Sequence, residues 1–179
     1  MKTIIILFFL TTCLTFAIPS FESLGWGFTI DAIKGFYPEV EREFTPSSEV
    51  TKYNYYPKDT DTGKIVFYLV DNQLYKIITI FDPTKIKSAD VEDMFNDYSK
   101  QWGTPVSAIV DSTYEEFSLK ENEQTWIVGT TYISLIGQDY FDNDNNLTNS
   151  KLIVEYGLID PAKRKRKSSL NNLILDKNN

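Results

Sequence analysis

The sequence predicts an α+β fold in which an antiparallel sheet of about six or seven strands carries two helices packed on one face. Three observations support this prediction. Two segments have the apolar spacing and capping residues of short amphipathic helices, and several others alternate or run continuously apolar as strands do. The loops between the strand segments are short, which favours antiparallel pairing. The expected chain order is α-βββ-α-ββββ.

The first helix is expected over residues 29–37. Thr29 has the hydroxyl of an N-cap, and Asp31 places negative charge in the first turn, where the helix dipole favours it. Pro38 ends the element because proline cannot continue the helical hydrogen bonds. The polar residues 39–49 are expected to form a loop. One apolar face is formed by Ile30, Ile33 and Tyr37.

Three strands are expected after this loop. Residues 50–56 and 74–81 flank an unbroken apolar run at 65–70, which is typical of a central strand. Residues 59–63, with their aspartates and glycine, predict a turn. The dipeptide 71–72, Asp-Asn, fits a two-residue hairpin turn because both residues tolerate a left-handed backbone.

The second helix gives the clearest signal of the chain. Ser88 is expected to cap it, Gly103 to stop it, and Pro105 to block its continuation. The spacing of four, three and four residues along one side predicts an apolar stripe that packs into the core. This stripe consists of Val91, Phe95, Tyr98 and Trp102.

The remaining segments predict four more strands. Gly129 and Thr130 suit a type II′ hairpin turn between two of them, because glycine fits the first loop position. Residues 138–150 are polar and are expected to form a long loop. The four strands are expected at 106–110, 124–128, 131–136 and 152–157.

The chain divides into a signal peptide at 1–17, one domain at 18–160 and a basic tail at 161–179 that is expected to be disordered. A lysine, a short apolar run and small residues ending at Ala17 are the pattern of a cleavable secretory signal, with Ile18 as the mature N-terminus. An alternative is that Cys13 is the lipidated residue of a lipobox. Cys13 is the only cysteine, so no intramolecular disulfide can form.

Composition restricts the chemistry. The chain has no histidine, which excludes histidine-based triads and histidine-ligated metals. The net charge is −7, so the folded domain should repel the phosphates of nucleic acid. No cofactor and no metal are expected.

Several motifs resemble those of known exported proteins. Residues 24–29, Leu-Gly-Trp-Gly-Phe-Thr, followed by a helix and Tyr37-Pro38, resemble the opening of many small exported bacterial proteins of unknown function. The helix end at Trp102-Gly-Thr-Pro105, and Trp126 ahead of Ile133 and Leu135, resemble their later parts. The helix-then-three-strands unit is also similar to outer-membrane assembly lipoproteins of the SmpA/OmlA type and to tandem-repeat β-lactamase inhibitor proteins. A function carried over from them would rest on fold analogy.

Few groups of acidic residues in the sequence suggest a metal site or a catalytic site. Asp142, Asp144 and Asn146 alternate like the start of a calcium loop, but the glycine and glutamate that an EF-hand requires are absent. Asn146 also begins a glycosylation triplet. No catalytic residue is assigned. Carboxylates on or beside strands that could form a hydrolytic pair are Asp111, Glu115, Glu116 and Glu155.

Two groups of residues are candidates for binding. Tyr53, Tyr55 and Tyr56 crowd one strand, and alternation points the first two to one face and the third to the other. Exposed tyrosines could stack on sugars or anchor a protein. The basic run in the tail could bind an anionic membrane or another polyanion. It consists of Lys163, Arg164, Lys165, Arg166 and Lys167.

The expected function is an exported, non-catalytic interaction or assembly module of the bacterial envelope, secreted or periplasmic, with another envelope protein as its partner. One alternative is a glycan- or small-ligand-binding protein that uses exposed aromatic residues. Another is a carboxylate-dependent hydrolase. A flat apolar patch would favour a protein partner, an exposed tyrosine row a glycan, and a cleft with paired carboxylates hydrolysis.

Overall fold

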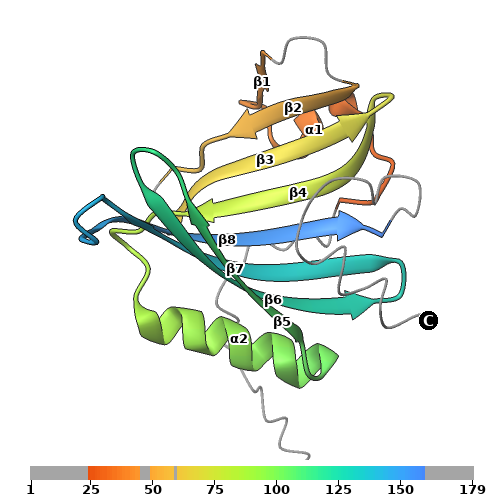
Figure 1. The fold of residues 1–179 in the computed structure, drawn as a ribbon. Coiled ribbons are helices and arrows are strands. Elements are labelled where there is room, and N and C mark those ends of the chain that lie inside the picture. The colour runs from red at the N-terminus through yellow and green to blue at the C-terminus, as the bar shows by residue number, and fades with distance from the viewer. Residues whose placement is uncertain (1–23, 45–48, 59, 160–179) are drawn as a thin grey trace, which may run out of the picture.

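The computed structural model describes residues 24–44, 49–58 and 60–159 and contains one antiparallel sheet with two helices (Figure 1). The expected signal peptide, Cys13 and the basic tail lie outside these residues. The helices are α1 (Ile30–Phe36) and α2 (Ser88–Trp102). The strands are β1 (Glu41–Glu43), β2 (Val50–Tyr55), β3 (Thr62–Val70), β4 (Gln73–Phe81), β5 (Val106–Thr113), β6 (Ser118–Val128), β7 (Thr131–Phe141) and β8 (Leu147–Leu158).

Within the described residues the sheet has eight strands in the order β1-β2-β3-β4-β8-β7-β6-β5, and every neighbouring pair is antiparallel. The chain therefore builds two α-ββββ units of the same topology, and their last strands, β4 and β8, meet at the centre. Ile77 lies opposite Tyr156 in this central pair. The α+β class is as predicted, but the strand number and the order α-βββ-α-ββββ were wrong.

The register places both helices on the same side of the sheet. Ile77 of β4 packs in the cluster under α1, while Tyr156 of β8 packs against the cluster under α2. Residues that lie directly opposite in an antiparallel pair point to the same face. Because Ile77 and Tyr156 are such a pair, the two helices cover one face.

The first unit is closed by the short helix α1. The Thr29 hydroxyl accepts a hydrogen bond from the N–H of Ala32 at 3.5 Å, so the predicted cap is present. Ile33 is fully buried beneath the helix. Tyr37 follows the helix and packs its ring against Phe67 of β3, with ring centroids 5.0 Å apart. The helix thus packs on the sheet through the predicted face, with Ile33 fully buried and Ile30 and Tyr37 partly buried.

The second unit has a longer helix and larger core side chains. The predicted stripe on α2 packs against the sheet as expected, around Tyr98 and the fully buried Trp126. The Trp126 Nε1–H donates to the Gly103 carbonyl at 2.9 Å, which ties the end of α2 to β6. The expected Ser88 cap was wrong. Ser88 already lies in the helix, and the Asp90 carboxylate accepts the N–H of Lys87 at 2.7 Å.

Three stretches of strand that the sequence analysis missed are rich in polar residues. One of them is the first part of β6, which begins at Ser118 and not at residue 124. Residues 39–49 were expected to be loop, but Glu41–Glu43 form β1. The expected long loop at 138–150 is mostly strand, since β7 and β8 remain paired through Tyr140 and Asn149. Cross-strand side chains support this extension, as Ser150 Oγ donates to Asp139 Oδ1 at 2.6 Å. Polar pairs of this kind stabilise a ladder without an apolar pattern that would predict it.

Among the described residues, no helix is long and apolar enough to cross a membrane.

Candidate functional site

The face of the sheet opposite the helices, which we call the helix-free face, carries an ordered set of side chains. The printed registers place residues from different strands in rows across this face. One row is Lys64, Ile80, Ile153, Ile136 and Glu123. The next is Val66, Ile78, Glu155, Ser134 and Thr125.

The centre of the helix-free face is apolar. Four half-buried isoleucines from β4, β7 and β8 lie together there, and neither helix-side core cluster includes them. No helix of the described part of the chain packs over them. We call this set the isoleucine patch; it consists of Ile78, Ile80, Ile136 and Ile153.

One border of the patch is built around Glu155. Lys76 Nζ lies 3.4 Å from Glu155 Oε2, and the Tyr132 hydroxyl donates to Glu155 Oε1. Burial raises the pKa of Tyr132, with the charge of Glu155 adding to the effect, so the hydroxyl stays protonated and remains a donor. The same Lys76 ammonium lies 4.5 Å from the ring centroid of Tyr68.

Gly157 makes this arrangement possible. A Cβ atom at Gly157 would lie 2.5 Å from Tyr132 Cε1, which is far inside van der Waals contact. Gly157 and Tyr132 are directly opposite in the β7–β8 pair. The tyrosine ring therefore lies over the bare backbone of Gly157, and its hydroxyl reaches Glu155. A side chain at position 157 would displace the ring.

A second carboxylate, Glu123, is almost completely buried at the β6 side of the patch. Only 6% of the residue is exposed. The Thr125 hydroxyl donates to Glu123 Oε1 at 3.2 Å. Burial raises the pKa of Glu123, and the hydrogen bonds from Ser134 and Thr125 offset part of this rise. Glu123 is thus a buried acid held by hydroxyl groups.

The β1–β3 border of the face is built around Glu43. Its carboxylate lies 3.6 Å from Lys52 Nζ and 3.7 Å from Lys64 Nζ. Asn54 Nδ2 donates to it at 3.1 Å, and this bond is the main reason that the pKa of Glu43 is lowered. The lysines and glutamates of the face are therefore already engaged with one another in part.

Lysines and tyrosines also pair across the helix-free face. Lys52 lies over the Tyr68 ring, Lys64 over Tyr56, and Lys151 over Tyr140, with ammonium-to-centroid distances of 5.5, 5.7 and 4.8 Å. Together with Lys76, each of these lysines covers one side of a tyrosine ring. A cation above a ring face is favourable, and it occupies a face that a ligand would otherwise use.

The tyrosines predicted from the sequence divide between the two faces. Tyr53 and Tyr55 are half-buried on the helix side, where Tyr55 meets the Tyr37 ring edge-on at 5.0 Å. Tyr56 points to the helix-free side and is 51% exposed. Of the three, only Tyr56 contributes to the face described here. The basic run Lys163–Lys167 lies outside the described residues.

The acidic residues suggested as a hydrolytic pair do not come together. Glu115 and Glu116 lie in the β5–β6 turn and Asp111 is exposed on β5, while Glu155 is central. Glu123 and Glu43 both share the helix-free face with Glu155, and the sequence analysis missed both of them. The only available signal for Glu123 was its place among Thr125 and Glu121 on alternate positions of one strand. Its proximity to Glu155 depends on the non-local pairing of β6, β7 and β8.

The loop that resembles a calcium site is used for its own turn. Asp142 Oδ1 accepts the N–H groups of Asp144 at 3.0 Å and Asn146 at 2.8 Å. These bonds, led by that from Asn146, lower the pKa of Asp142. Asp142 therefore caps the β7–β8 turn. Within the described ranges, no cluster of three or more acidic or cysteine side chains could hold a metal.

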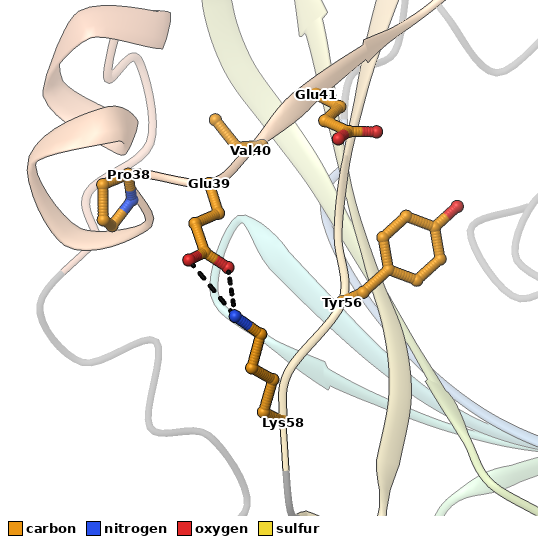
Figure 2. A pocket seen from close by; sticks show the side chains of 6 residues that line it. All are labelled: Pro38, Glu39, Val40, Glu41, Tyr56 and Lys58. Carbon is orange, nitrogen blue, oxygen red and sulfur yellow. Dashed lines mark hydrogen bonds and ion pairs between the residues drawn. The ribbon is translucent and has the colours of Figure 1, made fainter.

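A hollow of about 530 Å³ lies beside the α1–β1 connection (Figure 2). At its border Lys58 Nζ lies 3.3 Å from Glu39 Oε2, and both side chains are largely exposed. The lining offers one ion pair and no buried polar group directed into the space. The lining residues are Pro38, Glu39, Val40, Glu41, Tyr56 and Lys58.

Comparisons with known proteins give little further information. No family model and no curated protein matches the chain. Among solved structures, an extracellular protein containing a SCP domain from Bacillus anthracis str. Ames is similar, with 13% sequence identity and a TM-score of 0.40. The match covers 73% of this chain but only 43% of that protein. A likeness of this strength assigns neither a fold family nor a function.

Proposed function

We propose that the protein is an exported, non-catalytic interaction module of the bacterial envelope that binds a protein partner through the helix-free face. The observation that carries this proposal is the isoleucine patch, half-buried at the centre of the sheet and bordered by charged residues. Apolar side chains surrounded by polar ones are the usual anatomy of a protein–protein interface. Patches of this kind on a soluble protein commonly mark interaction sites.

The border of the patch supports a protein partner over a glycan. Sugars stack on open aromatic faces, but Tyr56, Tyr68 and Tyr140 each have a lysine over one ring face. Ion pairs such as Lys76–Glu155 are fixed before binding, so less conformational freedom is lost when a partner docks. Charged residues at the rim would then select a partner of matching charge.

Hydrolysis is supported less well. Glu155 is neutralised by Lys76, and Glu123 is buried among hydroxyls rather than directed into a cleft. A glycosidase needs its two carboxyl groups on opposite sides of a bound sugar. The hollow described above lies by the α1–β1 connection and includes neither of these glutamates.

Export remains part of the proposal and rests on the sequence. The mature protein is expected to begin at Ile18, with lipidation of Cys13 as the alternative, and intact-mass spectrometry of the exported protein distinguishes these two forms.

The basic run Lys163–Lys167 would attract the protein to an anionic membrane by about 1 kcal/mol per residue near its surface. Removing residues 163–179 should leave folding unchanged and abolish salt-sensitive binding to anionic vesicles.

Site-specific photo-crosslinking in the producing bacterium tests the binding face. A crosslinker at Ile136, in the patch, should give one discrete adduct with an envelope protein. The same group at Glu92, an exposed position on α2, should not give that adduct. The adduct should also disappear when Ile78→Lys is added, provided that the variant keeps its melting temperature. Equal labelling from both positions, or no adduct from Ile136, would contradict the proposal.

A further inference from the structure

The two edge strands of the sheet, β1 and β5, differ in how well they are protected against pairing with a strand of another molecule. The β1 edge is three residues long and consists of Glu41, Arg42 and Glu43. The β5 edge is eight residues long and contains no lysine, arginine or proline within Val106–Thr113. Its register with β6 is continuous, without a bulge. Short strands, charged side chains and bulges are the usual protections against strand addition, and β5 has almost none of them.

The hydrogen bonds of β5 show which residues face outward. The N–H of Tyr114 donates to the Phe117 carbonyl at 2.8 Å. The backbone N–H and C=O groups of every second residue before Tyr114 therefore point toward β6. In an antiparallel pair, bonding toward one neighbour alternates along the strand. The backbone N–H and C=O groups of the residues in between therefore point away from the sheet. These belong to Ser107, Ile109, Asp111 and Thr113, and all four residues are exposed.

We propose that β5 pairs antiparallel with β5 of a second copy of this chain, centred on Ile109. In this register Ile109 lies opposite Ile109 of the other copy, and the two residues exchange both of their outward hydrogen bonds. Ser107 lies opposite Asp111 at each side of the centre. The two sheets join into one continuous sheet across the new pair.

The strand itself indicates a second copy as the occupant. Read in the opposite direction, the outward series Ser107, Ile109, Asp111 complements itself, because isoleucine meets isoleucine and serine meets aspartate. In the single chain the Ser107 hydroxyl donates to Gln124 Oε1, and in the pair it would turn to the Asp111 carboxylate of the other copy. The two Asp111 carboxylates are not opposite each other. Ile109 is 67% exposed in the single chain, and this pairing would cover it. The pairing leaves the helix-free face free, so it is independent of the proposed function.

The overall charge predicts how association responds to salt. Each copy has a net charge of −7, so two copies repel at long range. Added salt shortens the Debye length from about 30 Å at 0.01 M to about 8 Å at 0.15 M. Backbone hydrogen bonds and apolar contact are much less affected. Association should therefore strengthen as salt rises over this range.

Sedimentation velocity and light scattering of the protein lacking the signal peptide test the pairing. The expected result is a concentration-dependent species with the mass of two chains. Ile109→Pro removes one outward N–H without removing a bond to β6, and it should return the protein to a single chain. Ile109→Lys should do the same, whereas Ile127→Lys, the same change at an exposed position outside the pairing, should not. A single chain at all concentrations, or a dimer that persists in Ile109→Pro, overturns the proposal.

Engineered cysteines test the register. The protein lacking the signal peptide has no native cysteine, because Cys13 is the only one in the sequence. In this protein Ile109→Cys should form a covalent dimer under mild oxidation, because directly opposed residues lie within disulfide distance. Ser107→Cys alone should not, since the two copies of that residue are then far apart along the strand. Ser107→Cys combined with Asp111→Cys should restore crosslinking. Equal crosslinking by the two single variants would contradict this register, and a dimer formed by another surface would crosslink in neither.

Discussion

The two α-ββββ units share one topology, yet each holds its helix in a different way. In the first unit the seven-residue α1 buries Ile33 against β3 and β4. In the second unit the fifteen-residue α2 packs against Trp126, with Tyr98 between the helix and the sheet. What the units share is the side of the sheet that is covered and the central pairing of β4 with β8. The strand order therefore fixes the architecture, and the size of the core side chains differs between the units.

The largest predicted effect is in the second unit. Trp126→Ala should lower the free energy of unfolding by about 3–5 kcal/mol, because the ring is fully buried and its N–H holds the Gly103 carbonyl. Urea titration followed by circular dichroism measures the loss. Trp102→Ala is the control, since that ring is only half-buried and should cost less. A loss below about 1 kcal/mol for Trp126→Ala would mean that α2 does not depend on this ring.

A smaller loss is expected in the first unit. Ile33→Ala should cost about 2–3 kcal/mol, because the side chain is fully buried but the short α1 can shift to fill part of the cavity. The same titration applies. The double variant with Trp126→Ala shows whether the two clusters act independently. A sum that holds within about 0.5 kcal/mol supports separate clusters, and a clear departure shows that they are coupled through β4 and β8.

The sequence predicted some elements of the two units and missed others. The apolar stripe and the C-terminal end of α2 were predicted correctly, because helical periodicity is a local property and Trp102-Gly-Thr-Pro105 ends the helix within a few residues. The Asp71–Asn72 turn was also predicted, and both residues have positive φ angles, 51° and 60°. The sequence analysis missed β1, the first part of β6 and the outer ends of β7 and β8, because polar cross-strand partners stabilise these stretches. Those partners are known only after the register is known.

The candidate site was less predictable than the fold. Alternation separated Tyr53 and Tyr55 from Tyr56, but which side faced solvent depended on where α1 packs. Glu155 was noted from the sequence, while Glu123 was not, because nothing local shows that the two share a face. The isoleucines of the patch come from three strands that are distant along the chain. Their meeting is a property of the β4–β8–β7 pairing alone.

A hydroxyl contact beneath α2 gives a more modest test. The hydroxyl groups of Tyr98 and Tyr156 lie 2.9 Å apart and share a hydrogen bond between helix and sheet. Tyr98→Phe should cost about 1 kcal/mol, the typical value for one such bond. Thermal unfolding measures it, and Tyr114→Phe at an exposed turn is the control. No loss would mean that water replaces the bond and that ring packing alone holds α2.

The smallest expected effects are changes in melting temperature that depend on pH. They come from one carboxylate in each unit, Glu43 in the first and Glu123 in the second. Burial raises the pKa of Glu123 above its ordinary value of 4.5, so the folded state favours the protonated acid. The protonated Glu123 side chain stabilises the folded state below pH 4.5, and this contribution is lost as the pH rises through the raised pKa. Glu123→Gln should therefore raise the melting temperature at pH 7 and change it little at about pH 4.

Glu43 should behave in the opposite sense. Its pKa is lowered, chiefly by the hydrogen bond from Asn54, so its contribution is present above 4.5 and is lost as the pH falls through the lowered pKa. Glu43→Gln should lower the melting temperature at pH 7, by less than about 2 °C because the side chain is only half-buried and solvent screens its charge. Melting curves of both variants from pH 3 to pH 8 decide the matter. If Glu123→Gln instead lowers the melting temperature at pH 7, the ionised carboxylate is the form that Thr125 and Ser134 stabilise.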